Sequence, residues 1–175
     1  VCVRGARKGF LIEKPMYVKK YLLSNTMGRF NLYALGGKWG FIDSHGNVTI
    51  QPAYEYAFNF HNKRSIVRSK GKYGVIDSSA IDFVVQPAYD SISRLDGSGG
   101  QMFRLEMKKQ KWGFVNYKGE FITDMAYDGT RDFKNGCAAV SRAGKWTFVD
   151  STGKEISDFI FDKVRDFNEG LAAVK

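Results

Sequence analysis

The sequence contains few of the residues on which metal sites and disulfide-stabilised scaffolds depend. It has two cysteines, two histidines and three prolines in 175 residues. Two cysteines do not make a disulfide framework. Neither His45 nor His61 has a Cys, His or acidic neighbour at metal-ligand spacing. We therefore predict no zinc or iron site and no cofactor.

Long apolar runs are absent as well. No segment approaches the roughly 20 apolar residues of a helix that crosses a bilayer, so we expect no membrane span. The sequence does not begin with Met and shows no secretory signal pattern, and residues 168–174 open a strand whose continuation is missing. These features predict a piece of a longer protein and give no indication of localisation.

Aromatic residues and glycines are plentiful. Phe, Tyr and Trp make up 15% of the chain, and there are 19 glycines. This composition favours strands and tight turns over helices. Apolar residues at 43% and charged residues at 26% are typical of a folded protein. We predict an all-β fold.

Positive charge is concentrated in the N-terminal part of the chain. The net charge is +9, but residues 1–75 hold 13 Lys and Arg against three acids, and residues 76–175 hold 14 against 15. This asymmetry indicates an anionic partner, and a merely solvated basic surface explains it at least as well. The candidate residues for such a partner are Arg4, Arg7, Lys8, Lys19, Lys20, Arg64, Arg68 and Lys70.

A six-residue block recurs four times. Lys-Trp-Gly-Phe-Ile-Asp at residues 38–43 returns as Lys-Tyr-Gly-Val-Ile-Asp at 72–77, Lys-Trp-Gly-Phe-Val-Asn at 111–116 and Lys-Trp-Thr-Phe-Val-Asp at 145–150. Turn residues, a short apolar stretch and the motif Gln-Pro-Ala-Tyr or a reduced form of it follow each block. Pro52 and Pro87 cannot donate to a β-ladder, so we expect them to mark strand ends.

Each copy is expected to form a three-stranded antiparallel meander of about 34 residues. Such a unit cannot bury its own rings, so the copies are expected to stack into a repeat array. The predicted divisions are a degenerate repeat or cap at 1–36, then repeats at 37–70, 71–109 (with a Gly-rich insertion), 110–143 and 144–175, the last running into a truncated unit. The expected structural core consists of Trp39, Phe41, Tyr73, Val75, Trp112, Phe114, Trp146 and Phe148.

These recurring blocks resemble the WG-containing repeat family, which is named for the Trp-Gly pair. The resemblance covers residues 31–175, with Tyr73 in place of Trp and Thr147 in place of Gly as departures. It implies tandem β-rich units in multi-repeat bacterial proteins and brings no known catalytic residue.

The acids of the repeats have a structural interpretation. Asp43, Asp77 and Asp150 occupy one turn position, which Asn116 fills in the other copy, as Asx preferences in turns explain. The pairs Asp128/Asp132 and Asp162/Asp166 recur at equal offsets but lack the dense pattern of a calcium loop, so turn and capping roles are expected. We predict no catalytic or metal residue and no enzymatic activity.

Aromatic residues between the meanders are the better functional lead. Packing between repeats is the favoured interpretation of each, and a repeated exposed row would instead form a groove for an extended partner. They are Tyr54, Tyr56, Phe58, Phe60, Tyr89 and Tyr127.

The sequence thus predicts a non-enzymatic module for protein–protein binding or scaffolding. The first alternative is a binder of an anionic polymer, nucleic acid or envelope glycan, through the basic N-terminal half. The second is an enzyme whose catalytic domain lies outside this segment.

Overall fold

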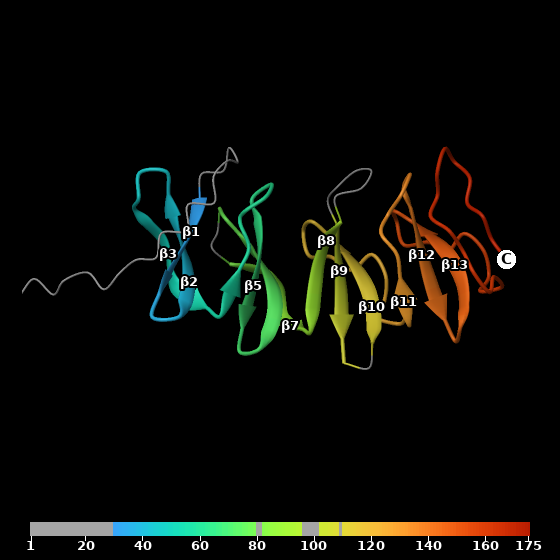
Figure 1. The fold of residues 1–175 in the computed structure, drawn as a ribbon, viewed down its shortest axis with the longest axis horizontal. Helices are drawn as coiled ribbons and strands as arrows, with labels where there is room; N and C mark the ends of the chain where they lie inside the picture. The colour runs from blue at the N-terminus through green and yellow to red at the C-terminus, as the bar shows by residue number, and fades with distance from the viewer. Residues whose placement is uncertain (1–29, 80–81, 96–101, 109) are drawn as a thin grey trace, which may run out of the picture.

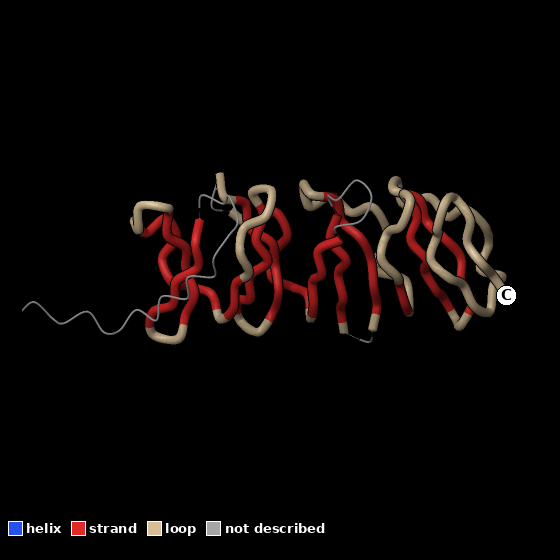
Figure 2. Tube along the Cα trace, turned by 45° about the horizontal axis from the view of Figure 1, so that its top comes forward, coloured by secondary structure: helices blue, strands red, loops and turns tan. Residues whose placement is uncertain are grey.

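The computed structural model describes residues 30–79, 82–95, 102–108 and 110–175. In these ranges the chain forms antiparallel sheets that follow one another in a row in chain order (Figure 1). Strands, turns and loops account for the whole of this part, and no helix is drawn in it (Figure 2). No membrane-spanning helix is found among these residues. The predicted all-β class is confirmed.

Four sheets are present in the described ranges. Sheet 1 contains β1 (Phe30–Leu35), β2 (Lys38–Asp43) and β3 (Val48–Tyr54); sheet 2 contains β4 (Tyr56–Ala57), β5 (Arg64–Ser69), β6 (Lys72–Asp77) and β7 (Phe83–Tyr89). Sheet 3 contains β8 (Ser91–Leu95), β9 (Met102–Met107) and β10 (Lys111–Asn116); sheet 4 contains β11 (Gly129–Thr130), β12 (Cys137–Arg142) and β13 (Lys145–Asp150). The tandem meanders are as predicted, and sheet 2 adds a fourth strand.

The recurring block forms one strand of every sheet: β2, β6, β10 and β13. In sheets 1 and 2 the next strand, β3 or β7, pairs with it along its length. In sheets 3 and 4 the corresponding partner is reduced to isolated bridges, such as Trp112 with Tyr127 and Trp146 with Phe161. One sheet passes into the next at the short connection after Tyr54, Tyr89 or Tyr127. The division of the chain into repeats at 37–70, 71–109, 110–143 and 144–175 stays a prediction.

The core lies between the sheets. Side chains alternate from face to face along a strand, so neighbouring residues enter different clusters. Val67 and Ile76 of sheet 2 pack toward Phe41 of sheet 1. Ile66 and Val75 of the same strands pack toward sheet 3. Further clusters join sheet 3 to sheet 4, and sheet 4 to residues 161–172. The predicted stacking of copies is confirmed.

The aromatic position of the block has the same environment in every copy. Trp39, Tyr73, Trp112 and Trp146 are each partly buried against the cluster that joins their own sheet to the next segment of the array. Two positions further along, Phe41 and Phe114 are fully buried, with 0% of their surface exposed. Trp39 and Phe41 thus share a face, as period-two alternation predicts.

A second aromatic residue completes three of these junctions. The ring of Phe41 lies 4.6 Å from that of Phe60, which belongs to the next sheet's segment. The same contact recurs between Phe114 and Phe133 at 5.1 Å, and between Phe148 and Phe167 at 4.7 Å. Each pair joins the block strand of one unit to the connecting segment that follows it in the array. The repeated phenylalanine therefore links successive units.

The prediction that Pro52 and Pro87 end strands is wrong. They lie inside β3 and β7, at shifts of register opposite the glycine of the block. A Cβ on Gly40 would lie 2.8 Å from the Pro52 nitrogen, and one on Gly74 would lie 2.9 Å from that of Pro87. Proline lacks an N–H, so the irregular ladder leaves no amide donor unsatisfied there.

Candidate binding surface

The turn acids act on the backbone of their own turns. The Asp43 carboxylate accepts hydrogen bonds from the N–H groups of His45 and Asn47, both at 2.8 Å. Asp150 accepts in the same way from Thr152 and Lys154, and Asn116 from Lys118 and Glu120. Hydrogen bonds from the side chain and backbone of Asn47 lower the pKa of Asp43. This geometry matches the predicted turn role and does not point to catalysis.

A repeated ion pair links the first residue of each block to the connection between sheets. Lys38 lies 4.0 Å from Glu55, and Lys145 lies 2.5 Å from Asp162. Lys72 pairs with Asp90, and Lys111 with Asp128, in the same manner. The Asp128 carboxylate also accepts the N–H of Ala143 at 2.7 Å. The lysine of the block is therefore engaged within the array in every copy.

Asp132 and Asp166, the second acids of the pairs Asp128/Asp132 and Asp162/Asp166, join neighbouring segments. Arg104 of β9 lies 2.8 Å from Asp132, and Arg131 lies 3.5 Å from Asp166. The guanidinium of Arg104 also lies over the Trp112 ring at 5.3 Å, and that of Arg131 over the Trp146 ring at 5.7 Å. Among the described residues, no group of His, Cys, Asp and Glu has the arrangement of a metal site.

Arg64, one of the candidate anion-binding residues, is held inside the array. Only 11% of its side chain is exposed, and it forms an ion pair with Asp77. Its Nε donates to the carbonyl of Tyr117 at 3.0 Å, and its guanidinium lies 4.4 Å from the centre of that ring. Since Tyr117 follows β10 of sheet 3, Arg64 clamps sheets 2 and 3 together.

The other candidate basic residues fall into two groups. Arg4, Arg7, Lys8, Lys19 and Lys20 lie outside the described residues. Arg68 and Lys70 lie on and beside β5, where the Arg68 side chain is 44% exposed and Lys70 occupies the hairpin turn with φ 52°. The structure thus brings Arg68 and Lys70 together at one end of sheet 2 and places Arg64 in a different contact.

The aromatic residues between the meanders differ in exposure. Tyr54, Tyr89 and Tyr127 are buried, and Phe60 is partly buried in the junction between sheets 1 and 2. Tyr56 and Phe58 are exposed to 45% and 42%. Packing between repeats explains the first four residues and leaves Tyr56 and Phe58 unexplained.

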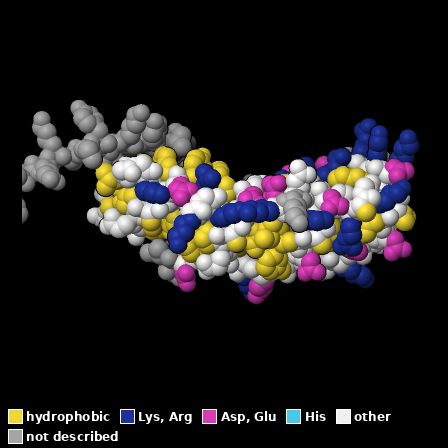
Figure 3. Space-filling model, turned by 90° about the horizontal axis from the view of Figure 1, so that it is seen from below, with side chains coloured by type: hydrophobic (Ala, Val, Ile, Leu, Met, Phe, Trp, Pro, Cys, Tyr) yellow, Lys and Arg dark blue, Asp and Glu magenta, His cyan; other side chains and the backbone are white. Residues whose placement is uncertain are grey.

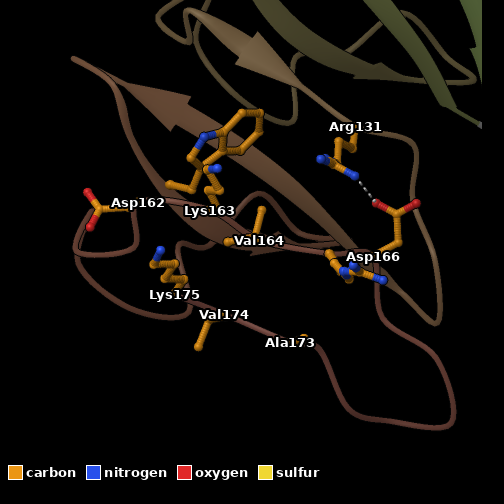
Figure 4. A pocket seen from close by; sticks show the side chains of 10 residues that line it. Arg131, Asp162, Lys163, Val164, Asp166, Ala173, Val174 and Lys175 are labelled. Carbon is orange, nitrogen blue, oxygen red and sulfur yellow. Dashed lines mark hydrogen bonds and ion pairs between the residues drawn. The ribbon is translucent and has the colours of Figure 1, made fainter.

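One hollow in the described part lies at the C-terminal end of the array. Its volume is about 920 Å³, and it lies beside the hairpin in which Val164 pairs with Val174 (Figure 4). In β12 the equivalent residue, Val140, is fully buried beneath neighbouring units, whereas Val174 is 46% exposed. Arg131 and Asp166 at the rim face each other (Figure 4).

A second, polar hollow of about 410 Å³ lies between sheet 4 and the segment after β10. Its charged groups engage one another: the Tyr127 hydroxyl and the Arg142 guanidinium each lie 3.3 Å from Glu155. Burial, with a further contribution from Glu155, raises the pKa of Tyr127 to about 12. Sequence reasoning missed this network, because it depends on how adjacent units are placed against each other.

These observations define the chain as a stacked array of β-meander repeats, and comparison with known proteins identifies the repeat. A model of the WG containing repeat matches residues 39–73, 112–146 and 146–175. The matches cover more than half of the chain, which therefore belongs to the WG-containing repeat family. A search of curated proteins gives no significant match.

Several solved structures are similar at low sequence identity. The computationally designed Ika8 protein is 11% identical, with 86% of this chain and 53% of that chain covered and a TM-score of 0.45. Hsv2 of Kluyveromyces lactis is 15% identical, with 82% and 53% covered and a TM-score of 0.43. PorZ of Porphyromonas gingivalis, described as a surface component of the type-IX secretion system, is 12% identical, with 86% and 22% covered and a TM-score of 0.39. The chain spans about half the length of the first two.

Proposed function

We propose that this chain is a non-enzymatic repeat module that binds another protein. The observation that carries the proposal is that the repeated charged groups are used inside the array. The repeated acids and lysines hold turns and adjacent units together, while exposed aromatic side chains remain on the surface. A surface of this kind is suited to recognition, because aromatic rings supply contact area at a protein interface.

Membership of the WG-containing repeat family agrees with this proposal. Stacked repeats present an extended surface, along which a partner can make contacts with several units. A scaffolding role follows from the same geometry, since separate units of one array can hold separate partners.

The experiment is binding with purified components. The chain is immobilised, proteins retained from an extract of its source cells are identified, and each is then produced alone. Saturable one-to-one binding of one such protein in calorimetry supports the proposal. If every retained protein fails to bind the purified chain, the proposal is wrong.

The distribution of charge supports a second proposal, binding of an anionic polymer through residues 1–75. Lys70 is exposed, and Arg68 keeps 44% of its side chain exposed although it lies 3.9 Å from Glu55, whereas Arg64 is engaged with Asp77 and Tyr117. Retention on heparin or DNA should then fall steeply with salt. Reversing the charge of Lys19, Lys20, Arg68 and Lys70 together should abolish retention; absence of retention at low salt would exclude this role.

A further inference from the structure

Two exposed aromatic residues stand out when the copies are compared position by position. The copies are aligned on the aromatic residue that precedes each connection: Tyr54, Tyr89, Tyr127 and Phe161. The later units then carry Ser91, Gly129 and Lys163 at the position of Tyr56. At the position of Phe58 they carry Ser93, Arg131 and Arg165. Small or polar residues are the expected choice for a solvent-facing strand position. Only at Tyr56 and Phe58, among these described positions, does the array place aromatic rings there.

The two rings form a continuous surface with the first tryptophan of the repeat. The Tyr56 ring lies 5.1 Å from that of Phe58 and 6.5 Å from that of Trp39, which belongs to the neighbouring sheet. We call Trp39, Tyr56 and Phe58 the aromatic strip. Burial in the core does not account for it, because 45% of Tyr56 and 42% of Phe58 remain exposed.

The strip lies in a positively charged setting. Arg68 is the cross-strand partner of Tyr56, and the side chains of Arg68 and Lys38 are 44% and 47% exposed. Lys70 is exposed in the adjoining hairpin turn. The nearby acid Glu55 lies within 4.0 Å of Lys38 and Arg68 and also accepts the N–H of Gly71 at 3.0 Å. The view from below shows hydrophobic side chains interspersed with Lys and Arg and with Asp and Glu along the array (Figure 3).

The ring geometry favours a peptide over a nucleic acid. The interplanar angles are 62° between Trp39 and Tyr56 and 73° between Tyr56 and Phe58. Successive bases need rings on which they can stack, and rings turned edge to face do not form such a coplanar platform. They instead provide walls between which apolar side chains can insert. One member of the strip, Tyr56, lies in β4, which is an edge strand of sheet 2, and an extended segment can add to an edge of this kind.

We propose that the aromatic strip binds an extended peptide segment of a protein partner, with apolar side chains between acidic residues. The apolar side chains contact Trp39, Tyr56 and Phe58, and the acidic residues face Arg68 and Lys70, which are exposed beside the strip. This inference rests on the proposed protein-binding function and assigns its contact surface.

The test compares the native chain with the double variant Tyr56→Ser/Phe58→Ser. These substitutions give sheet 2 the serine pair that sheet 3 carries as Ser91 and Ser93, so the fold should be retained. The matched control is Ile160→Ser, which changes an apolar residue that is 60% exposed elsewhere. Circular dichroism and the unfolding midpoint establish that all three proteins are folded.

Random peptides displayed on phage are the probe, and enriched sequences are synthesised for fluorescence anisotropy. Enrichment of apolar residues flanked by Asp or Glu, with affinity reduced about tenfold or more in the double variant and unchanged in the control, is the expected result. Equal binding to the double variant, or the absence of enriched peptides, would overturn the assignment. Oligothymidine binding that depends on Tyr56 and Phe58, without peptide binding, would also overturn it.

The two proposals can fail separately. If a purified protein partner binds the native chain and the double variant equally, the module binds protein and the aromatic strip is not its contact. If no protein partner binds the purified chain but selected peptides require Tyr56 and Phe58, the strip is a peptide site and the wider function is wrong.

Discussion

Gly153 lies against the backbone of Ile122 in the neighbouring unit, and a Cβ atom at Gly153 would overlap the Ile122 carbonyl oxygen. Gly119 lies in the same way against the carbonyl of Val84, one unit earlier. Both glycines have positive φ, 87° and 86°. The turn glycine of the repeat therefore has two roles: it permits the left-handed turn, and it allows the turn to rest on the preceding unit.

This contact predicts unequal costs for two similar substitutions. Gly144→Ala places a side chain at φ 79° in open space, so we expect only a backbone cost of about 1–2 kcal/mol. Gly153→Ala adds the overlap with Ile122, which should lower the free energy of unfolding by about 1–3 kcal/mol more. Denaturant titration measures both. Equal losses would show that the close approach is relieved at no cost.

The aromatic junctions predict energetic coupling across units. For Phe114 and Phe133, whose rings are 5.1 Å apart, a double-mutant cycle with leucine should give a coupling energy of about 0.5–1.5 kcal/mol. Phe114 and Phe41 belong to different clusters, and their substitutions should be additive within about 0.5 kcal/mol. Thermal or urea unfolding of the single and double variants tests this. Strict additivity for the first pair would contradict the junction.

The turn acids should tolerate an amide but not an alanine. Asn116 makes the same backbone hydrogen bonds as Asp150, so Asp150→Asn should leave the unfolding midpoint nearly unchanged. Asp150→Ala removes the acceptor and should lower the midpoint. Measurement near neutral pH keeps the Asp150 carboxylate ionised in the folded and the unfolded chain; in the folded chain, hydrogen bonds from Thr152 lower its pKa. If both variants lose the same stability, the charge matters and the turn interpretation is wrong.

Tyr127 predicts a loss of stability at alkaline pH. Burial raises its pKa to about 12, above its ordinary value of 10.0. The unfolded chain releases this proton first, so the stabilising contribution is complete below pH 10 and is lost as the pH rises toward about 12. Tyrosinate absorbance and unfolding midpoints measured together report the effect. In Tyr127→Phe the alkaline decline should be smaller; an unchanged decline would assign it to other groups.

Much of the fold could be predicted because the repeat places the same residue types in the same relation four times. Alternation within the Lys-Trp-Gly-Phe-Ile-Asp block predicted that Trp39 and Phe41 share a face, and their common cluster confirms this. The position of Pro52 was mispredicted. Proline usually interrupts a ladder, but a register shift opposite Gly40 accommodates it within β3.

The candidate surface was harder to predict, because it depends on contacts between units. Arg64 and Arg68 are similar in sequence context, yet only Arg64 meets the carbonyl and ring of Tyr117 from the next sheet. Likewise, Tyr54 and Tyr56 are separated by one residue, but one is buried and the other is 45% exposed. Burial of this kind follows from the placement of the neighbouring unit, which a single copy does not encode.

Sheet stacking also turns position in the sequence into position along an axis. Packed sheets lie roughly 10 Å apart, so equivalent solvent-facing positions of successive units are spaced at about that distance. Ser91 and Ser93 occupy these positions in the unit next to Tyr56 and Phe58. Exchanging the two exposed side chains of a unit therefore lengthens or shortens the proposed binding surface by one unit. The buried residues that fix the spacing of the sheets stay unchanged.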